Sequence, residues 1–344
     1  MADLVKILNT IRENASAEYQ KRIPVATRTN LENIAQNMGT YQSTMNEMLT
    51  SLVNRIAMVI IHNKMIKNPL AILKKGGVPM GKDIEEIFVN PAISESYSYT
   101  SEDLLAVKTP DVKALYYGLN RQDKYSVTIT RPMLMKALTS DSEMSSLINK
   151  IVSSLYSGDN FDEFKLMKQL VAQACKKEHA KVETMSWDLA KMTPENSTQL
   201  VKAIKTDMGM MKFASSDYNS YDKVKPSSDN RGNVITFTPL EDQVLLIDSR
   251  VLTNVGIDVL ASAFNLDKAS FMGQVIEVDN FNGEPILAMA CDRNWFRVFD
   301  KLLTTSNMWN PDTLTYKYWL HHWQTLSYCM FANAKIYKYT PTEE

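Results

Sequence analysis

The residues whose spacing could do chemistry lie in a glycine-rich stretch. Residues 76–82 read Gly-Gly-Val-Pro-Met-Gly-Lys and match the spacing of a phosphate-binding loop. Asp83 stands where that motif has the serine or threonine that holds magnesium, and its charge would repel phosphates. The following residues are typical of a strand, whereas the motif needs the N-terminus of a helix. A glycine-rich turn is therefore the favoured interpretation, with a nucleotide-binding enzyme using residues 76–82 as an alternative.

Metal ligation is the second chemistry to consider. The chain has 4 histidines, at His62, His179, His321 and His322. The adjacent pair His321 and His322 would point about 100° apart in a helix and would not share a metal easily. No carboxylate or cysteine falls at ligand spacing beside them. The sequence thus predicts no metal site.

General acid–base catalysis needs two carboxyl groups that face one reacting group. The adjacent acidic pairs are Glu85-Glu86, Glu102-Asp103 and Glu241-Asp242. Neighbouring residues of a strand face opposite sides, so these pairs are interpreted as solvated or salt-bridging residues. The chain also lacks a Gly-x-Ser-x-Gly motif. We therefore predict no catalytic residues, no cofactor-binding or metal residues, no cofactor and no enzymatic activity.

Composition excludes several classes of function. Hydrophobic residues make up 44% and charged residues 22% of 344 residues, and the formal net charge is -1. Without a basic excess, tight binding of nucleic acid by the whole chain is not expected. The scattered cysteines Cys175, Cys291 and Cys329 are typical of a reducing compartment. The apolar run from Ile56 to Ile61 is too short to span a bilayer, and no membrane partner is expected.

The elements that must position these residues alternate between helical and strand patterns. Helices are predicted over 3–21, 30–66, 141–155 and 161–179, with a break or kink at 157–160, and again from Ser197 and from Ser249. Strands are predicted over 234–237, 243–247, 273–278, 286–290, 296–299 and 335–339. The aromatic residues near the C-terminus are interpreted as core or intersubunit packing; they are Trp309, Tyr316, Tyr318, Trp319, Trp323, Tyr328 and Phe331.

The stretch from Ile84 to Leu138 contains two strand-like runs, 84–89 and 125–130. About 35 mostly polar residues separate these runs, and they cannot bury enough apolar surface to offset their own ordering entropy. We expect residues 90–124 to be ordered by an adjacent subunit, so that deletion of 95–120 leaves a folded subunit that fails to close shells. The stretch indicates assembly rather than catalysis.

Three groups of residues carry a family resemblance. They are 81–89; 125–129 leading into 140–155; and 248–264 with 266–269, 309–311 and 319–331. In these residues and in the order of its elements, the chain resembles the major capsid proteins of tailed bacteriophages, and most of all the small phi-twenty-nine-like podoviruses. The resemblance implies an α+β, Hong Kong 97-type fold with N-terminal helices, an extended two-stranded E-loop, a long spine helix and an axial α/β domain.

The resemblance also implies a domain division and partners. The divisions are 1–69 (N-terminal arm and helices), 70–132 (E-loop), 133–199 (peripheral domain with spine helix), 200–315 (axial domain) and 316–344 (return to the peripheral domain). The implied function is self-assembly, through pentamers and hexamers, into an icosahedral or prolate head around double-stranded DNA. Expected partners are a scaffolding protein, a portal or connector, and head fibre or decoration proteins, with DNA contacted weakly. The expected location is the virion, assembled in host cytoplasm. An encapsulin-type shell around protein cargo is the alternative with the same fold.

Overall fold

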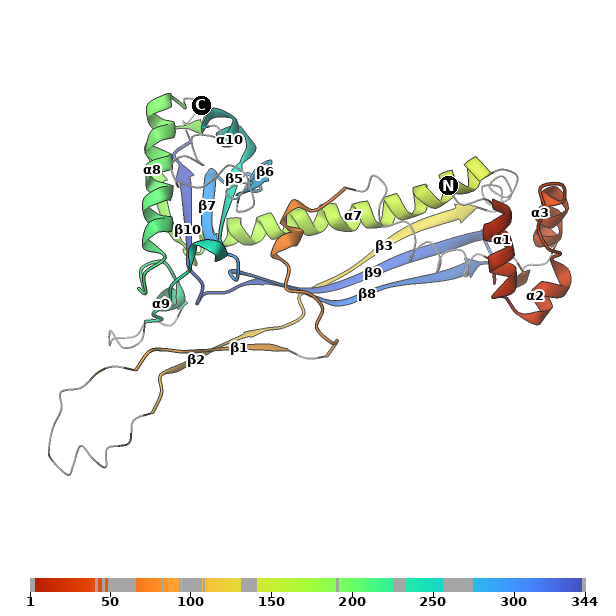
Figure 1. The fold of residues 1–344 in the computed structure, drawn as a ribbon, viewed down its shortest axis with the longest axis horizontal. Helices are drawn as coiled ribbons and strands as arrows, with labels where there is room; N and C mark the ends of the chain where they lie inside the picture. Colours follow the sequence, from red (N-terminus) through yellow and green to blue (C-terminus); the bar gives the residue numbers. More distant parts are fainter. Residues whose placement is uncertain are drawn as a thin grey trace. The chain divides into compact units, whose positions relative to one another are not determined.

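The computed structural model describes residues 4–40, 43–44, 47–48, 66–81, 83–92, 94, 107, 109–130, 141–189, 192–224, 233–255 and 275–341. The chain divides into two compact units. Unit 1 comprises Met1–Asn68, Gln122–Glu163 and Leu302–Trp323, and unit 2 comprises Pro69–Arg121, Phe164–Lys301 and Gln324–Glu344. Figure 1 labels the helices and strands along the chain. Each unit has its own hydrophobic core and is described by itself.

Unit 1 begins with three helices, α1 (Leu4–Glu13), α2 (Ala17–Arg22) and α3 (Leu31–Thr40). The single helix predicted over 3–21 is therefore wrong, because the chain breaks before Ser16. The Ser16 hydroxyl caps α2 by accepting a hydrogen bond from the Tyr19 amide at 3.2 Å, a role that serine favours at a helix start. Arg12 in α1 donates to the carbonyl of Ile23 at 2.8 Å and so satisfies a backbone group at the end of α2. The helix predicted over 30–66 begins at Leu31, and most of 41–65 lies outside the described residues.

The spine of the chain is α7 (Asp141–Lys176), a continuous helix of 36 residues. The long spine helix that was predicted is therefore confirmed, and α7 runs through 157–160 without the break that was allowed for there (Figure 1). The polar residues there find partners on the helix surface instead of ending it. Asn160 donates to the carbonyl of Ile66 at 2.9 Å, and the Asp159 carboxylate lies 2.7 Å from Nδ1 of His322. Tertiary contacts have overridden the local turn preference of these residues.

A three-stranded sheet in the order β3-β9-β8 accompanies these helices. Its strands are β3 (Arg121–Thr130), β8 (Phe296–Asn310) and β9 (Thr315–Tyr328). Burial alternates along β9, as expected for a strand with one face on a core. The core of unit 1 includes Tyr19 and Ile34 of the helices with Ile129, Tyr318 and Leu320 of the sheet. The predicted strand over 296–299 is thus much longer in the structure, and the aromatic segment 316–328 is a strand.

Unit 2 is built on a five-stranded mixed sheet in the order β4-β10-β7-β5-β6. Its strands are β4 (Lys181–Met185), β5 (Gln243–Asp248), β6 (Val275–Val278), β7 (Ile286–Asp292) and β10 (Ala334–Tyr339). The pairs β4–β10 and β5–β6 are parallel, and β7 is antiparallel to both β5 and β10. Every residue of β5 and β7 is buried, which explains the apolar runs 244–247 and 286–291 within them.

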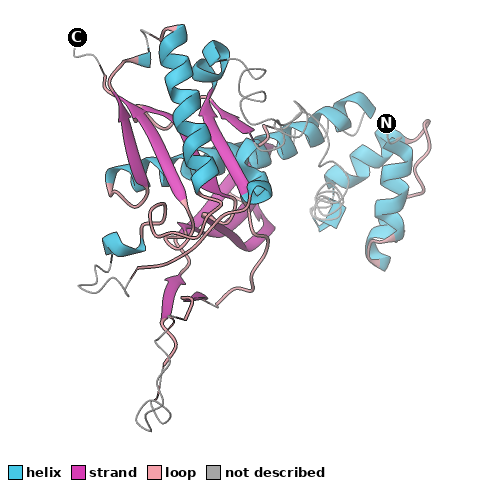
Figure 2. Ribbon diagram, turned by 60° about the vertical axis from the view of Figure 1, so that its left-hand side comes forward, coloured by secondary structure: helices cyan, strands magenta, loops and turns pink. Residues whose placement is uncertain are grey.

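Both faces of this sheet are covered. Leu245 and Ile247 of β5 face a core shared with α8 (Pro194–Met210) and α10 (Ser249–Val255). Val244 and Leu246 face the other core, which includes Met167 of α7 and Leu70 of the short helix η1 (Pro69–Leu73). Figure 2 shows helices against the strands. The described helices also include α9 (Tyr221–Val224) and η4 (Leu240–Asp242).

The predicted two-stranded excursion has different partners from those expected. Strand β1 (Ile84–Val89) pairs antiparallel with β2 (Val112–Tyr117), from Ile84 opposite Tyr117 to Val89 opposite Val112. The run predicted at 125–130 belongs to β3, in the three-stranded sheet. Residues 109–117 are therefore ordered within this chain, which corrects the expectation that an adjacent subunit orders all of 90–124. Residues 93, 95–106 and 108 lie outside the described residues.

Two smaller differences concern unit 2. The strand predicted over 234–237 is a single backbone bridge between Ser215 and Thr236. The helix predicted from Ser249 is described to Val255, and 256–274 lie outside the described residues. None of the described helices combines the length and the hydropathy needed to cross a membrane.

Candidate assembly surface

The glycine-rich stretch that matches a phosphate-binding loop is a turn bonded to β8. The amides of Lys75 and Val78 donate to the carbonyls of Val298 and Asp300 at 2.9 and 2.8 Å, so these donors are not available to a phosphate. Gly76 and Gly81 have φ of 90° and 86°, which explains the glycines. Strand β1 follows at Ile84, and Lys82 lies outside the described residues.

The histidines are dispersed over the structure. Nδ1 of His179 lies 2.8 Å from the Tyr328 hydroxyl, and burial, with the nearby charge of Lys177, lowers the pKa of His179. His321 contacts the hydroxyl of Ser306 at 2.8 Å, and His322 is buried against Asp159. His321 and His322 both lie in β9, so their side chains face opposite sides of a strand. The helix assumed for them from the sequence is not present. His62 lies outside the described residues.

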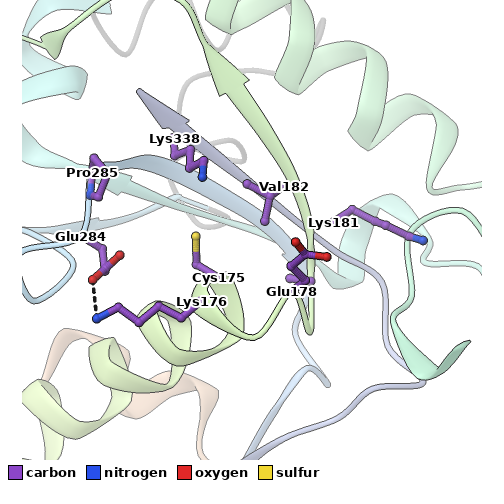
Figure 3. Close-up of a pocket in the computed structure, with 9 residues that line it drawn as sticks. Cys175, Lys176, Glu178, Lys181, Val182, Glu284, Pro285 and Lys338 are labelled. Atoms are coloured by element: carbon purple, nitrogen blue, oxygen red, sulfur yellow. Dashed lines mark ion pairs between the residues drawn. The ribbon is translucent and has the colours of Figure 1, made fainter. Parts of the chain in front are cut away.

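A cavity of about 510 Å³ opens at the C-terminal end of α7, between that helix and the edge of the five-stranded sheet (Figure 3). Cys175 points into it from α7, and the amine of Lys338 points toward the same space from β10. At its rim Lys176 pairs with Glu284 at 2.7 Å. Burial raises the pKa of the Cys175 thiol, which makes it a poor nucleophile at neutral pH.

The most distinctive surface lies on the hairpin formed by β1 and β2. Burial alternates along β1, so that one face of the hairpin points outward. Ile87 is 60% exposed and Tyr116 is 69% exposed, and Val89 and Val112 beside them are more than half exposed. The register places Val89 opposite Val112, so these side chains share one face. We call Ile87, Val89, Val112 and Tyr116 the outer row.

The inner face of the hairpin is fixed to the rest of unit 2 through a charged group. Arg297 in β8 donates to both carboxylate oxygens of Glu86, and the Tyr117 hydroxyl donates to the same carboxylate at 2.8 Å. The Cys329 thiol contacts it at 3.4 Å. Burial by itself would raise the pKa of Glu86, but the hydrogen bonds and charge of Arg297 outweigh burial and hold that pKa below its ordinary value.

Apolar contacts and a second polar clamp complete this attachment. Phe88 packs on Phe331 with ring centroids 5.4 Å apart. At the other end of β1, the Asn90 amide donates to Asp111 at 2.7 Å and to the Asn233 carbonyl at 2.8 Å. Its oxygen accepts from the Ile235 amide at 3.0 Å. The hairpin is thus held at both ends while its outer row stays uncovered.

Of the acidic pairs, Glu85 is solvated and Glu86 is ion-paired. Glu85 faces solvent and accepts from the Tyr116 hydroxyl at 2.8 Å, whereas Glu86 faces inward, so the prediction that strand neighbours face opposite sides is confirmed. Glu241 and Asp242 lie in η4, and Glu102-Asp103 lies outside the described residues. Among the aromatic residues, Tyr316, Tyr318 and Phe331 are buried in the cores, which confirms packing for these three.

Comparison with known proteins shows which family the chain belongs to. Residues 8–338 match the family described as Phi29-like phage major capsid protein. The chain belongs to this family. It is 34% identical to the major capsid protein of Bacillus phage B103 over 333 residues, covering 95% of this chain and 71% of that protein. It is 30% identical to the major capsid protein of Streptococcus phage Cp-1, covering 97% of this chain and 93% of that protein.

Solved structures agree on the fold of this phage major capsid protein. A capsid structure of Staphylococcus phage Andhra matches with a TM-score of 0.67 at 14% identity, covering 81% of this chain and 86% of that one. The capsid of Cyanophage P-SCSP1u matches with a TM-score of 0.53 at 10% identity, covering 82% and 91%. The expected α+β, Hong Kong 97-type fold and the capsid function are confirmed. The encapsulin-type shell and the nucleotide-binding enzyme have no support.

Sequence analysis found the first strand of the hairpin, but it chose the wrong partner strand and missed the residues that hold the hairpin. Arg297, Tyr117 and Asn90 were not singled out, since each acts on a group far away in the sequence. One signal for the outer row was present: Ile87 and Val89 alternate with Glu86 and Phe88 in a short strand.

Proposed function

We propose that the outer row of the β1–β2 hairpin is a contact between copies of this capsid protein in the phage head. The observation that carries the proposal is the exposure of four large side chains on one face of a hairpin whose other face is firmly attached. A row of exposed apolar residues marks an interaction site more often than an isolated one does. A rigid support keeps the ordering cost of such a contact low.

The proposal extends to the division of the chain. Residues 70–132 act as the E-loop, 133–199 as the peripheral domain with its spine helix, and 200–315 as the axial domain. Residues 1–69 form the N-terminal arm and helices, and 316–344 return to the peripheral domain. The continuous α7 and the five-stranded sheet support this division.

The head made of these subunits, arranged as pentamers and hexamers, encloses double-stranded DNA. Its partners are a scaffolding protein, a portal or connector, and head fibre or decoration proteins, and assembly takes place in host cytoplasm. The subunit's role is structural and not enzymatic. Contact with DNA is weak, as the net charge of -1 suggests. Duplex DNA binding by the purified subunit should fade as salt rises through physiological strength in a gel-shift titration; binding that resists salt would contradict weak contact.

A point substitution tests the outer row better than the deletion of 95–120. That deletion would remove β2 and the buried Tyr117, so a folded product is no longer expected. Ile87→Asp places a charge in the outer row, and because Ile87 is exposed the isolated subunit should fold normally. The matched control, Ile87→Val, keeps the row apolar and the strand intact.

Both variants are co-expressed with the phage's scaffolding protein, and particles are counted by electron microscopy after sedimentation. We expect closed particles from wild type and Ile87→Val, and soluble subunits or open fragments from Ile87→Asp. Urea unfolding of the purified subunits checks that folding is unchanged. Normal particles from Ile87→Asp would show that the outer row is not a subunit contact.

A further inference from the structure

A second group of exposed apolar side chains lies on unit 2, outside the hairpin. Phe213 is 67% exposed and Phe237 is 57% exposed, and Met210 and Ile235 beside them in sequence are also exposed. Backbone bonds hold the two segments together, because Ser215 and Thr236 exchange N–H···O bonds of 3.0 and 3.1 Å. We call Met210, Phe213, Ile235 and Phe237 the aromatic patch.

The aromatic patch rests on a well-bonded segment. The amide of Thr238 donates to the carbonyl of Met211 at 2.7 Å, and the buried Asn219 side chain donates to the carbonyl of Val234 at 2.7 Å. Val234 and Thr238 are fully buried, whereas Ile235 and Phe237 alternate with them and face outward. The exposure of the two outward residues is therefore imposed by a fixed backbone.

The segment that carries Ile235 is bonded to the end of the hairpin. Asn90 follows Val89 of the outer row directly, and its side chain accepts from the amide of Ile235 at 3.0 Å. The same side chain donates to Asp111, next to Val112. One asparagine therefore holds the end of β1 beside the backbone segment that carries Ile235.

We propose that the aromatic patch is a second docking surface for another copy of this chain, on a segment bonded to the end of the hairpin. The inference rests on the proposed function, since it assumes that the outer row is a subunit contact. Its four residues are uncharged, and the exposed Lys212 beside Phe213 is too little positive charge to hold a phosphate backbone tightly. Rigid, apolar and aromatic surfaces are typical of permanent contacts between subunits, and less so of transient ones.

Closed rings such as pentamers and hexamers require heterologous contacts, in which a surface on one subunit meets a different surface on the next. The aromatic patch and outer row of one copy therefore meet another part of its neighbour. A scaffolding protein is the competing occupant, and the test must separate the two.

The test introduces the photo-reactive residue benzoyl-phenylalanine in place of Phe213 or Phe237 in the full chain, co-expressed with the scaffolding protein. Illumination of assembled particles should give a cross-linked dimer of the capsid protein, identified by mass spectrometry. A cross-link to the scaffolding protein alone, or no cross-link from either position, would overturn the proposal.

A double variant, Phe213→Ser with Phe237→Ser, gives an independent reading. Because both side chains are exposed, the subunit should fold as wild type does, which urea unfolding checks. We expect about a tenfold lower yield of closed particles, in the range that loss of a central contact produces. An unchanged yield would contradict the proposal.

The comparison with Ile87→Asp separates the two proposals. If Ile87→Asp blocks assembly while the double variant assembles normally, the outer row is a contact and the aromatic patch is not. If Ile87→Asp assembles normally while the patch cross-links to a second copy, the role proposed for the outer row fails and the patch remains a subunit contact.

Discussion

The guanidinium of Arg297 in β8 contacts both carboxylate oxygens of Glu86 in β1, joining two segments 211 residues apart in the sequence. Both side chains are mostly buried, with 14% and 23% of their surfaces exposed. A bidentate pair of this kind fixes the relative orientation of the two side chains as well as the distance between them. Since the opposite face of β1 carries Ile87 and Val89, the pair also sets where the outer row points.

Arg297→Ala should lower the free energy of unfolding by about 2–4 kcal/mol, because it leaves the Glu86 carboxylate without its charged partner. The control is Lys176→Ala. Lys176 also pairs with a carboxylate, that of Glu284, but is 65% exposed, and its loss should cost less than about 1 kcal/mol. Urea unfolding of both variants measures the difference. Equal losses would show that the Arg297 pair adds nothing beyond a surface pair.

The same pair predicts a pH dependence. The pKa of Glu86 in the folded chain lies below its ordinary value of 4.5, so the folded state favours the ionised form. Its contribution to stability is therefore complete above that value and is lost as pH falls through the folded pKa. In urea unfolding from pH 7 down to pH 3, the advantage of wild type over Glu86→Gln should be constant above about pH 5 and shrink below about pH 4. A constant advantage over the whole range would contradict this assignment.

The hairpin shows how far sequence reasoning reaches. Alternation in residues 84–89 predicted β1 correctly, because side-chain periodicity is local information. Its partner could not be chosen in the same way, since Val112–Tyr117 and Tyr125–Thr130 are both plausible strands. The choice depends on bonds such as Tyr117 to Glu86, which only the folded chain brings together.

Helix α7 shows where local sequence patterns mislead. Gly158 and its polar neighbours favour a break when read locally. The helix continues because Asp159 and Asn160 bond to His322 and to the Ile66 carbonyl, residues that are distant in the sequence. The exposure of Phe213 and Phe237 was not predicted for the same reason: it depends on the burial of Val234 and Thr238, which only the folded chain produces.

A buried carboxylate ties α8 to the sheet of unit 2 and gives a third prediction. Asp207 accepts from the hydroxyl of Tyr337 at 2.7 Å, from that of Tyr218 at 3.0 Å and from the amine of Lys335 at 2.8 Å. Tyr337→Phe removes one hydrogen bond to a charged group and should cost about 1.5–3 kcal/mol. Tyr218→Phe, at a half-buried site, should cost less. Urea unfolding compares them, and a larger loss for Tyr218→Phe would reverse the proposed order.

The turn between β8 and β9 carries a strained residue. Leu314 has a φ of 50° and is 54% exposed. This left-handed backbone conformation costs any residue other than glycine about 1–2 kcal/mol. Leu314→Gly should remove that strain at the cost of a more flexible unfolded chain, raising the free energy of unfolding by about 0.5–1 kcal/mol. Met308→Gly, at an exposed position within β8, is the control and should lower it. If both glycine variants lose stability equally, Leu314 is not strained.

The three thiols should react in a fixed order. Cys291 and Cys329 are buried, whereas Cys175 is partly exposed in the cavity at the end of α7. In the folded subunit an alkylating reagent should therefore modify Cys175 alone, and the other two only in denaturant. Because burial raises the pKa of the Cys175 thiol, the reaction should be slower than that of a free thiol at pH 8 and should accelerate as pH rises further.

Mass spectrometry of tryptic peptides over time measures each site, and Cys175→Ser should abolish labelling of the folded chain. Labelling of Cys329 at the same rate as Cys175 would mean that the packing around Glu86 opens readily, and that the root of the hairpin is not the rigid support inferred from its contacts.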